Sequence, residues 1–146
     1  MSDNAEFEMK VFQESFNGNQ NAIQLCLNFL YIAHFWDDLI DKDKDRTDDE
    51  INKAFEIMLI FIPANPIYKE YGDILRPMLH STMLAWYESN IKEKGGEKDK
   101  FYAFFLRNAL LNIIIFICFL IGGDLKKLHN YFCDQFKDQY DNFVKE

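Results

Sequence analysis

The chain has 146 residues, of which 49% are hydrophobic and 15 are phenylalanine, and its formal net charge is −8. That apolar share can bury enough surface to offset the entropy of the chain, which excludes an intrinsically disordered protein, and the length predicts a single domain, residues 1–146. The negative charge repels phosphate groups, so nucleic acid is not expected as a partner. Six Gly and three Pro are too few for the frequent turns of a β-sandwich or barrel.

The cysteines and the N-terminus indicate the compartment. Cys26, Cys118 and Cys133 lie in apolar stretches without the Cys-x-x-Cys spacing of a metal or redox motif. An odd number of scattered thiols is typical of a reducing environment. The first ten residues are acidic and polar, unlike a secretory signal. The sequence therefore predicts a cytoplasmic protein.

The first half of the chain predicts three helices. A short helix ends near Gly18, and a long apolar helix follows over residues 19–41. After the charged loop 42–49, Thr47-Asp-Asp-Glu50 reads as a capping box, in which the hydroxyl and the carboxylate each accept from the backbone. The helix that it begins is expected to end at Ile62, because Pro63 follows.

The second half predicts the remaining helices. Residues 66–94 form a helix with a kink or break near Leu75, because Pro77 lies inside it. After a glycine turn, residues 99–121 form one helix, and Asp124 begins a last helix that reaches about Val144. Five or six helices with short connections predict an all-α, single-domain antiparallel helical bundle.

One segment is apolar enough to raise the question of a membrane. Residues 109–121 are almost wholly apolar, but this stretch has 13 residues before Gly122, whereas a spanning helix needs about 20. We therefore expect a buried central helix and no membrane span, with a spanning helix as the alternative.

The C-terminal end of the 19–41 helix carries a cluster of acids, Asp37, Asp38 and Asp41. At 100° per residue these carboxylates share one side of the helix, at the end where the helix dipole is negative. Positive charge should compensate them. A divalent cation such as Mg²⁺ would do so through oxygen ligands, and basic residues of the following loop, among them Arg46, are the simpler alternative.

The run Asp37-Asp38-Leu39-Ile40-Asp41, preceded by an aromatic-rich helix, resembles the Asp-Asp-x-x-Asp motif of class I isoprenoid and terpene synthases. The resemblance covers about residues 20–60. It implies the isoprenoid synthase fold, Mg²⁺ as cofactor and an isoprenoid diphosphate as ligand, bound or turned over by a lyase or transferase. By resemblance, Asp37 and Asp41 would bind the metal, and Asp38 would bind it or support a ligand.

Three polar residues of the 99–121 helix are candidates for substrate binding. Asn108 and Asn112 lie one turn apart in an apolar helix, and their amides could face the acids and contact metal-bound water or substrate. Arg107 could bind a diphosphate through its planar fork of donors. The alternatives are two core amides bonded to backbone and an arginine paired with an acid.

Two other acidic features are not assigned a chemical role. Asp134, Asp138 and Asp141 share the polar face of an amphipathic helix and are expected to face solvent. The loop that begins at Asp41 starts like an EF-hand but has Arg46 where the fold of that loop needs Gly.

Two other functions are compatible with the sequence. An all-α nucleotide pyrophosphohydrolase would also hold Mg²⁺ with helical acids, but the Glu-x-x-Glu pair typical of those enzymes is absent. A non-enzymatic helical interaction or accessory protein, such as a phage protein or a subunit of a homo-oligomer, would use the abundant aromatic residues as contact surface.

Overall fold

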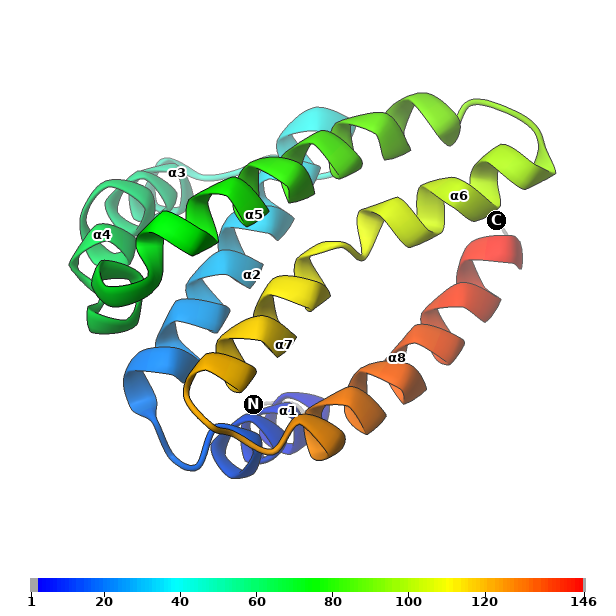
Figure 1. Cartoon of the computed structure of the whole chain (residues 1–146). Helices are drawn as coiled ribbons and strands as arrows, with labels where there is room; N and C mark the ends of the chain where they lie inside the picture. The colour runs from blue at the N-terminus through cyan, green and yellow to red at the C-terminus, as the bar shows by residue number, and fades with distance from the viewer. Residues whose placement is uncertain (1–2, 146) are drawn as a thin grey trace. The chain divides into compact units, whose positions relative to one another are not determined.

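A computed structural model describes residues 3–145, and within that range every regular element is helical (Figure 1). The prediction of an all-α helical bundle is confirmed. The elements in chain order are α1 (Asp3–Ser15), α2 (Gln20–Asp41), α3 (Asp48–Glu56), the π-helical turn η1 (Ile57–Phe61), α4 (Ile62–Ala64), α5 (Pro66–Lys92), α6 (Glu97–Arg107), α7 (Leu110–Leu120) and α8 (Leu125–Lys145).

The helix starts follow the capping residues in the sequence. The Thr47 hydroxyl accepts from the Glu50 amide (3.2 Å) and the Glu50 carboxylate accepts from the Thr47 amide (2.9 Å), which confirms the capping box. Asp124 caps α8 with a single bond, in which its carboxylate accepts from the Lys127 amide at 3.0 Å. Each side chain satisfies an amide that the first helical turn leaves without a partner.

Neither internal proline ends a helix where the sequence predicts it. Helical backbone continues through Pro63 to Ala64, because Pro63 stands in the first turn of α4, where its missing N–H is not needed. The chain becomes extended only at Asn65 (ψ 129°). Helix α5 runs through Pro77 without ending, so of the predicted kink or break the break is wrong and the kink stays a prediction.

The predicted 99–121 helix is divided into α6 and α7. At Asn108 the backbone leaves the helical region (φ −90°, ψ 10°), and its side-chain amide donates to the Phe104 carbonyl at 2.8 Å. Asn favours such local bonds to the backbone, and these compete with the helical pattern. The apolar periodicity continues across the turn, which is why the sequence alone suggests one helix.

The chain forms two compact units. Unit 1 consists of Met1–Gly18 and Asp73–Glu146, and unit 2 of Asn19–Gly72. Their boundary lies within α5, so each unit contains part of that helix.

In unit 1, α1 is fixed to the turn between α7 and α8. The Ser15 carbonyl accepts from the Asp124 amide at 2.7 Å, and the Asn17 side chain donates to the Gly122 carbonyl at 3.2 Å. The Tyr131 hydroxyl donates to Glu8 at 2.9 Å, joining α8 to α1. Buried side chains of the three helices and of the turn after α1 form the core: Phe12, Phe16, Ile113, Ile114, Ile117, Leu128 and Phe132.

In unit 2, Asn65 fixes the corner between α4 and α5 against the first turn of α2. Its amide donates to the Asn21 carbonyl at 2.8 Å, and its oxygen accepts from the Ile67 amide at 2.9 Å. Phe29 of α2 meets Tyr68 of α5 edge to face, with ring centroids 6.4 Å apart.

Among the described residues, one helical stretch, Glu97–Leu120, is long and apolar enough by composition to cross a membrane. Only 33% of its most apolar window is buried within the protein. The expectation of a buried helix at 109–121 therefore holds for one face, which includes Ile113 and Ile117, while Phe119 is 60% exposed.

Candidate functional site

Helix α2 brings the three predicted metal ligands to its C-terminal end. Asp37 and Asp38 are half-buried and Asp41 is exposed. The helix ends because Lys42 takes a left-handed conformation (φ 57°), in which its amide still bonds the Asp38 carbonyl at 3.0 Å. The carboxylates therefore lie beside backbone carbonyls, which adds to the negative potential at this end.

The Arg46 guanidinium neutralises part of that negative charge. Arg46, from the loop after α2, bonds Asp38 and also bonds Glu50 of α3, with Nη1 3.0 Å from the Glu50 carboxylate. Its side chain is only 11% exposed and lies over the Phe35 ring, 5.5 Å from the centroid. A planar guanidinium suits this double role, because it forks between two carboxylates while it stacks on an aromatic face.

The ionisation of this cluster reflects the same contacts. Burial works against the charge of Arg46, but the hydrogen bonds and charges of Asp38 and Glu50 raise its pKa. The Thr47 amide is the main cause that lowers the pKa of Glu50, and Arg46 contributes. The contacts thus favour the charged forms of both Arg46 and Glu50.

Carboxylate oxygens are the ligands that Mg²⁺ prefers, but the acids are not arranged as a ready metal site. Within residues 3–145, no three His, Cys, Asp or Glu side chains come close enough to hold one ion. Asp38 already binds Arg46, while Asp41 extends into solvent. The residues present match Mg²⁺ in chemistry and do not match it in arrangement.

The three predicted substrate residues lie in unit 1, whereas the acids lie in unit 2. Arg107 bonds Glu93 at 2.5 Å, Asn108 bonds the Phe104 carbonyl, and Asn112 is exposed. An acid partner for Arg107 and a backbone partner for Asn108 are the alternatives that the sequence left open. The exposed Asn112 fits neither a core amide nor a backbone-bonded one.

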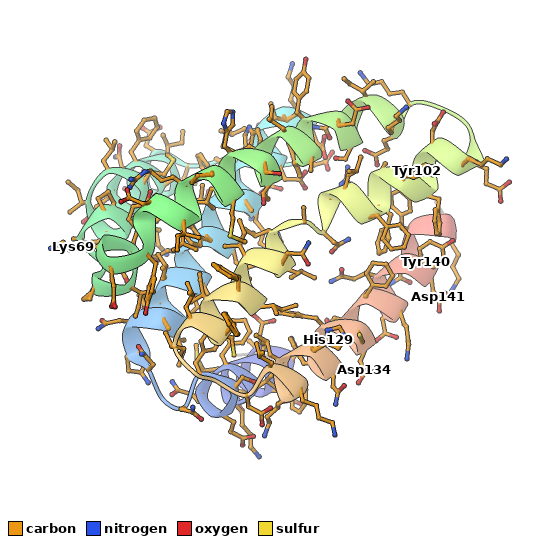
Figure 2. The ribbon with its side chains drawn as sticks, in the orientation of Figure 1. Lys69, Tyr102, His129, Asp134, Tyr140 and Asp141 are labelled. Atoms are coloured by element: carbon orange, nitrogen blue, oxygen red, sulfur yellow. The ribbon has the colours of Figure 1, made fainter. Side chains whose placement is uncertain are left out.

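The acids of α8 lie where the sequence predicts. Asp134, Asp138 and Asp141 are exposed, and Figure 2 shows Asp134 and Asp141 on the outer side of α8. Another face of α8 is aromatic. Tyr140 meets Phe101 and Phe104 of α6 edge to face, with ring centroids 5.7 and 5.3 Å apart.

A pocket of about 630 Å³ opens between these two helices in unit 1. Figure 2 shows Tyr102 of α6 and Tyr140 of α8 at its walls. The other lining residues are Glu97, Lys98, Lys100, Phe101 and Phe143. Its volume is within the range of small-molecule sites, but it presents no convergent set of buried polar groups that would orient a ligand.

Exposed apolar side chains are the feature that the sequence reasoning missed. On α5, Leu84, Tyr87 and Ile91 are 58%, 64% and 54% exposed. Their spacing, i, i+3 and i+7, places them on one stripe of the helix. The signal was present in the sequence, since α5 has apolar residues on more than one face, but the periodicity does not tell which face the core covers.

Comparison with known proteins assigns no function to this site. No protein-family model matches this chain, and no curated protein and no solved structure matches it significantly.

Proposed function

We propose that this protein is a non-enzymatic helical interaction protein whose α5 stripe, Leu84, Tyr87 and Ile91, pairs with the same stripe of a second copy. The observation that carries the proposal is the exposure of all three side chains by more than half in a folded chain. Large apolar side chains aligned on one helical stripe favour a helix–helix interface, because association removes them from water.

The second copy is the partner that the stripe itself suggests. In an antiparallel pair related by a two-fold axis between positions 84 and 87, Leu84 of each copy lies opposite Tyr87 of the other. In the same pair, Ile91 of each copy lies opposite His80 of the other. Because Leu84 and Tyr87 then cover each other and Ile91 packs on the His80 ring, one patch serves both sides.

Light scattering coupled to size-exclusion chromatography tests this proposal over a range of concentrations. We expect a dimer for the native chain and a monomer for Leu84→Asp/Ile91→Asp, because two apolar side chains are lost from the interface and a carboxylate at position 84 would be buried beside the Tyr87 ring. Leu59→Asp/Ile60→Asp is the matched control: it also replaces two exposed aliphatic residues, but in η1, and should remain a dimer. A native chain that is monomeric throughout contradicts the proposal.

A second candidate function is Mg²⁺-dependent binding of an isoprenoid diphosphate at Asp37, Asp38 and Asp41. It is supported by the charge balance at the end of α2, where Asp38 shares the Arg46 guanidinium with Glu50 and the sequence places Asp37 and Asp41 on the same side of the helix. The excess negative charge attracts a cation. Arg46 would have to release Asp38 to free that carboxylate for the metal.

Calorimetry with Mg²⁺ and pyrophosphate together tests the second candidate. We expect binding by the native chain, loss in Asp37→Asn/Asp41→Asn, and tighter Mg²⁺ binding in Arg46→Gln, because that variant frees the Asp38 carboxylate. If no variant binds, the acids are a charged helix end neutralised by Arg46.

A further inference from the structure

Four consecutive apolar residues of unit 2 stand exposed on the π-helical turn η1. Met58, Leu59, Ile60 and Phe61, which we call the apolar tip, are 37%, 67%, 57% and 48% exposed. Single exposed apolar residues are ordinary on a protein surface, whereas a contiguous group of this size calls for a ligand or partner.

The π-helical hydrogen bond explains why the whole group faces outward. The Ile62 amide bonds the Ile57 carbonyl, five residues back, and both side chains are buried, Ile57 at 3% and Ile62 at 8% exposed. In an α-helix, residues that share a buried face are three or four apart. Ile57 and Ile62 are five residues apart, so four residues lie between them, and all four project away from the core.

The arrangement of the tip distinguishes a lipid surface from a protein groove. A groove covers one stripe of a helix, such as positions i, i+3 and i+7. Successive residues of a helical turn point in directions that differ by roughly 90–100°, so the four side chains of the tip fan out around the turn. An apolar solvent that surrounds the turn covers them all, and the interface of a bilayer is such a solvent.

The backbone beside the tip carries few unsatisfied donors. Pro63 and Pro66 have no N–H. The Asn65 amide bonds the Ile62 carbonyl at 3.1 Å, and the Asn65 side chain accepts from the Ile67 amide. Satisfied or absent donors lower the cost of moving a segment out of water.

The charges that flank the tip indicate which headgroup it meets. Residues 53–70 contain two basic side chains, Lys53 and Lys69, and two acidic ones, Glu56 and Glu70, so the segment is neutral. Lys69 points outward, away from the ribbon of its unit (Figure 2). A neutral rim suits a zwitterionic headgroup, while the net charge of −8 on the whole chain disfavours an anionic surface.

We propose that the apolar tip, Met58–Phe61, inserts into the interface of a zwitterionic lipid bilayer and holds the protein on the membrane surface. The tip and the α5 stripe are different surfaces, so this inference is independent of the dimer.

Co-flotation of the full-length chain with phosphatidylcholine vesicles tests the proposal. We expect the native chain to float with the vesicles and Leu59→Asp/Ile60→Asp to lose about tenfold or more in partition coefficient, since each substitution replaces a buried aliphatic group by a carboxylate. Ile74→Asp/Phe119→Asp, which replaces two exposed apolar residues outside both the tip and the α5 stripe, is the matched control and should float like the native chain. Far-UV circular dichroism and the melting temperature check that each variant is folded.

A second measurement reports the tip directly. In a Leu59→Trp variant that also carries Trp36→Phe and Trp86→Phe, insertion should shift the fluorescence to shorter wavelength, and acyl chains carrying bromine should quench it. This readout does not depend on a variant that loses binding.

Several outcomes would overturn the proposal. They are a native chain that does not float, equal loss of flotation in both double variants, and binding that appears only when anionic lipid is added. If the tip variant abolishes the dimer and no chain floats, the tip is a protein interface instead.

Discussion

At the scale of single residues, Arg46 decides how the acidic end of α2 is used. The sequence offers two ways to compensate these acids, a metal ion or a basic residue of the loop. The structure brings the Arg46 guanidinium to both Asp38 and Glu50 and covers it with the Phe35 ring. Because the loop is short, the basic residue lies close to the acids whatever else binds there.

The first prediction concerns Glu50 and acid. Its pKa is lowered in the folded protein from the ordinary value of 4.5, so Glu50 stabilises the fold above that value, and this contribution is lost as the pH falls through the lowered pKa. We expect Glu50→Gln to lose less stability than the native chain between neutral pH and about pH 3. Urea unfolding at each pH measures it. Gln keeps the capping hydrogen bond, so an unchanged acid dependence would mean that the charge contributes nothing.

The second prediction concerns the thiols. Burial, helped by the charge of Asp124, raises the pKa of Cys118 to about 11, and Cys26 is fully buried, whereas Cys133 is partly exposed. The reactive species of a thiol is the thiolate. With a thiol reagent at mildly alkaline pH, we expect Cys133 to react rapidly in the native protein and all three cysteines to react after denaturation. Rapid native reaction in a Cys133→Ser variant would contradict the burial of the other two.

At the scale of elements, close approach of backbone explains one glycine. A Cβ on Gly123 would lie 2.4 Å from the Ser15 carbonyl and 2.6 Å from the Cys118 sulfur, where α1 meets the α7–α8 turn. On Gly96 it would meet nothing within 4 Å.

The third prediction follows from that contrast. Gly123→Ala should destabilise the protein by about 1–3 kcal/mol, because the Ser15 carbonyl and the Cys118 sulfur must both move away from the new methyl group. Gly96→Ala should change the stability by about 0.5 kcal/mol at most. Thermal unfolding of the two variants side by side measures the difference. Equal effects would mean that the α1 contact yields without cost.

Two local changes of helical hydrogen bonding could not be predicted from the sequence. Apolar periodicity extends across Asn108 and across η1, so it does not reveal that a side-chain bond to the Phe104 carbonyl ends α6 or that α3 widens into a π turn. Both are choices between hydrogen-bond partners that differ by one residue, and periodicity does not resolve such choices.

At the scale of the whole molecule, the two compact units raise the question of how the chain unfolds. The shorter one, unit 2, has the smaller core, and small cores bury a smaller share of their surface. Each unit contains one tryptophan, Trp36 in unit 2 and Trp86 in unit 1.

The fourth prediction uses these reporters. In Trp86→Phe the fluorescence of Trp36 follows unit 2, and in Trp36→Phe that of Trp86 follows unit 1. We expect the Trp36 transition at lower urea concentration. Coincident transitions would instead support the prediction from the sequence that residues 1–146 unfold as a single domain.

The sequence by itself determined the all-helical class and most helix boundaries, because the caps at Thr47 and Asp124 and the apolar periodicity act within a few residues of chain. It also identified the acidic end of α2 and its two means of compensation. Only the tertiary structure decided that Arg46 holds Asp38, and that Arg107 and Asn108 have partners within unit 1. It alone showed that the α5 stripe and the apolar tip stay exposed. Exposure and pairing depend on which surfaces meet when the chain folds, and a local pattern of residues does not contain that information.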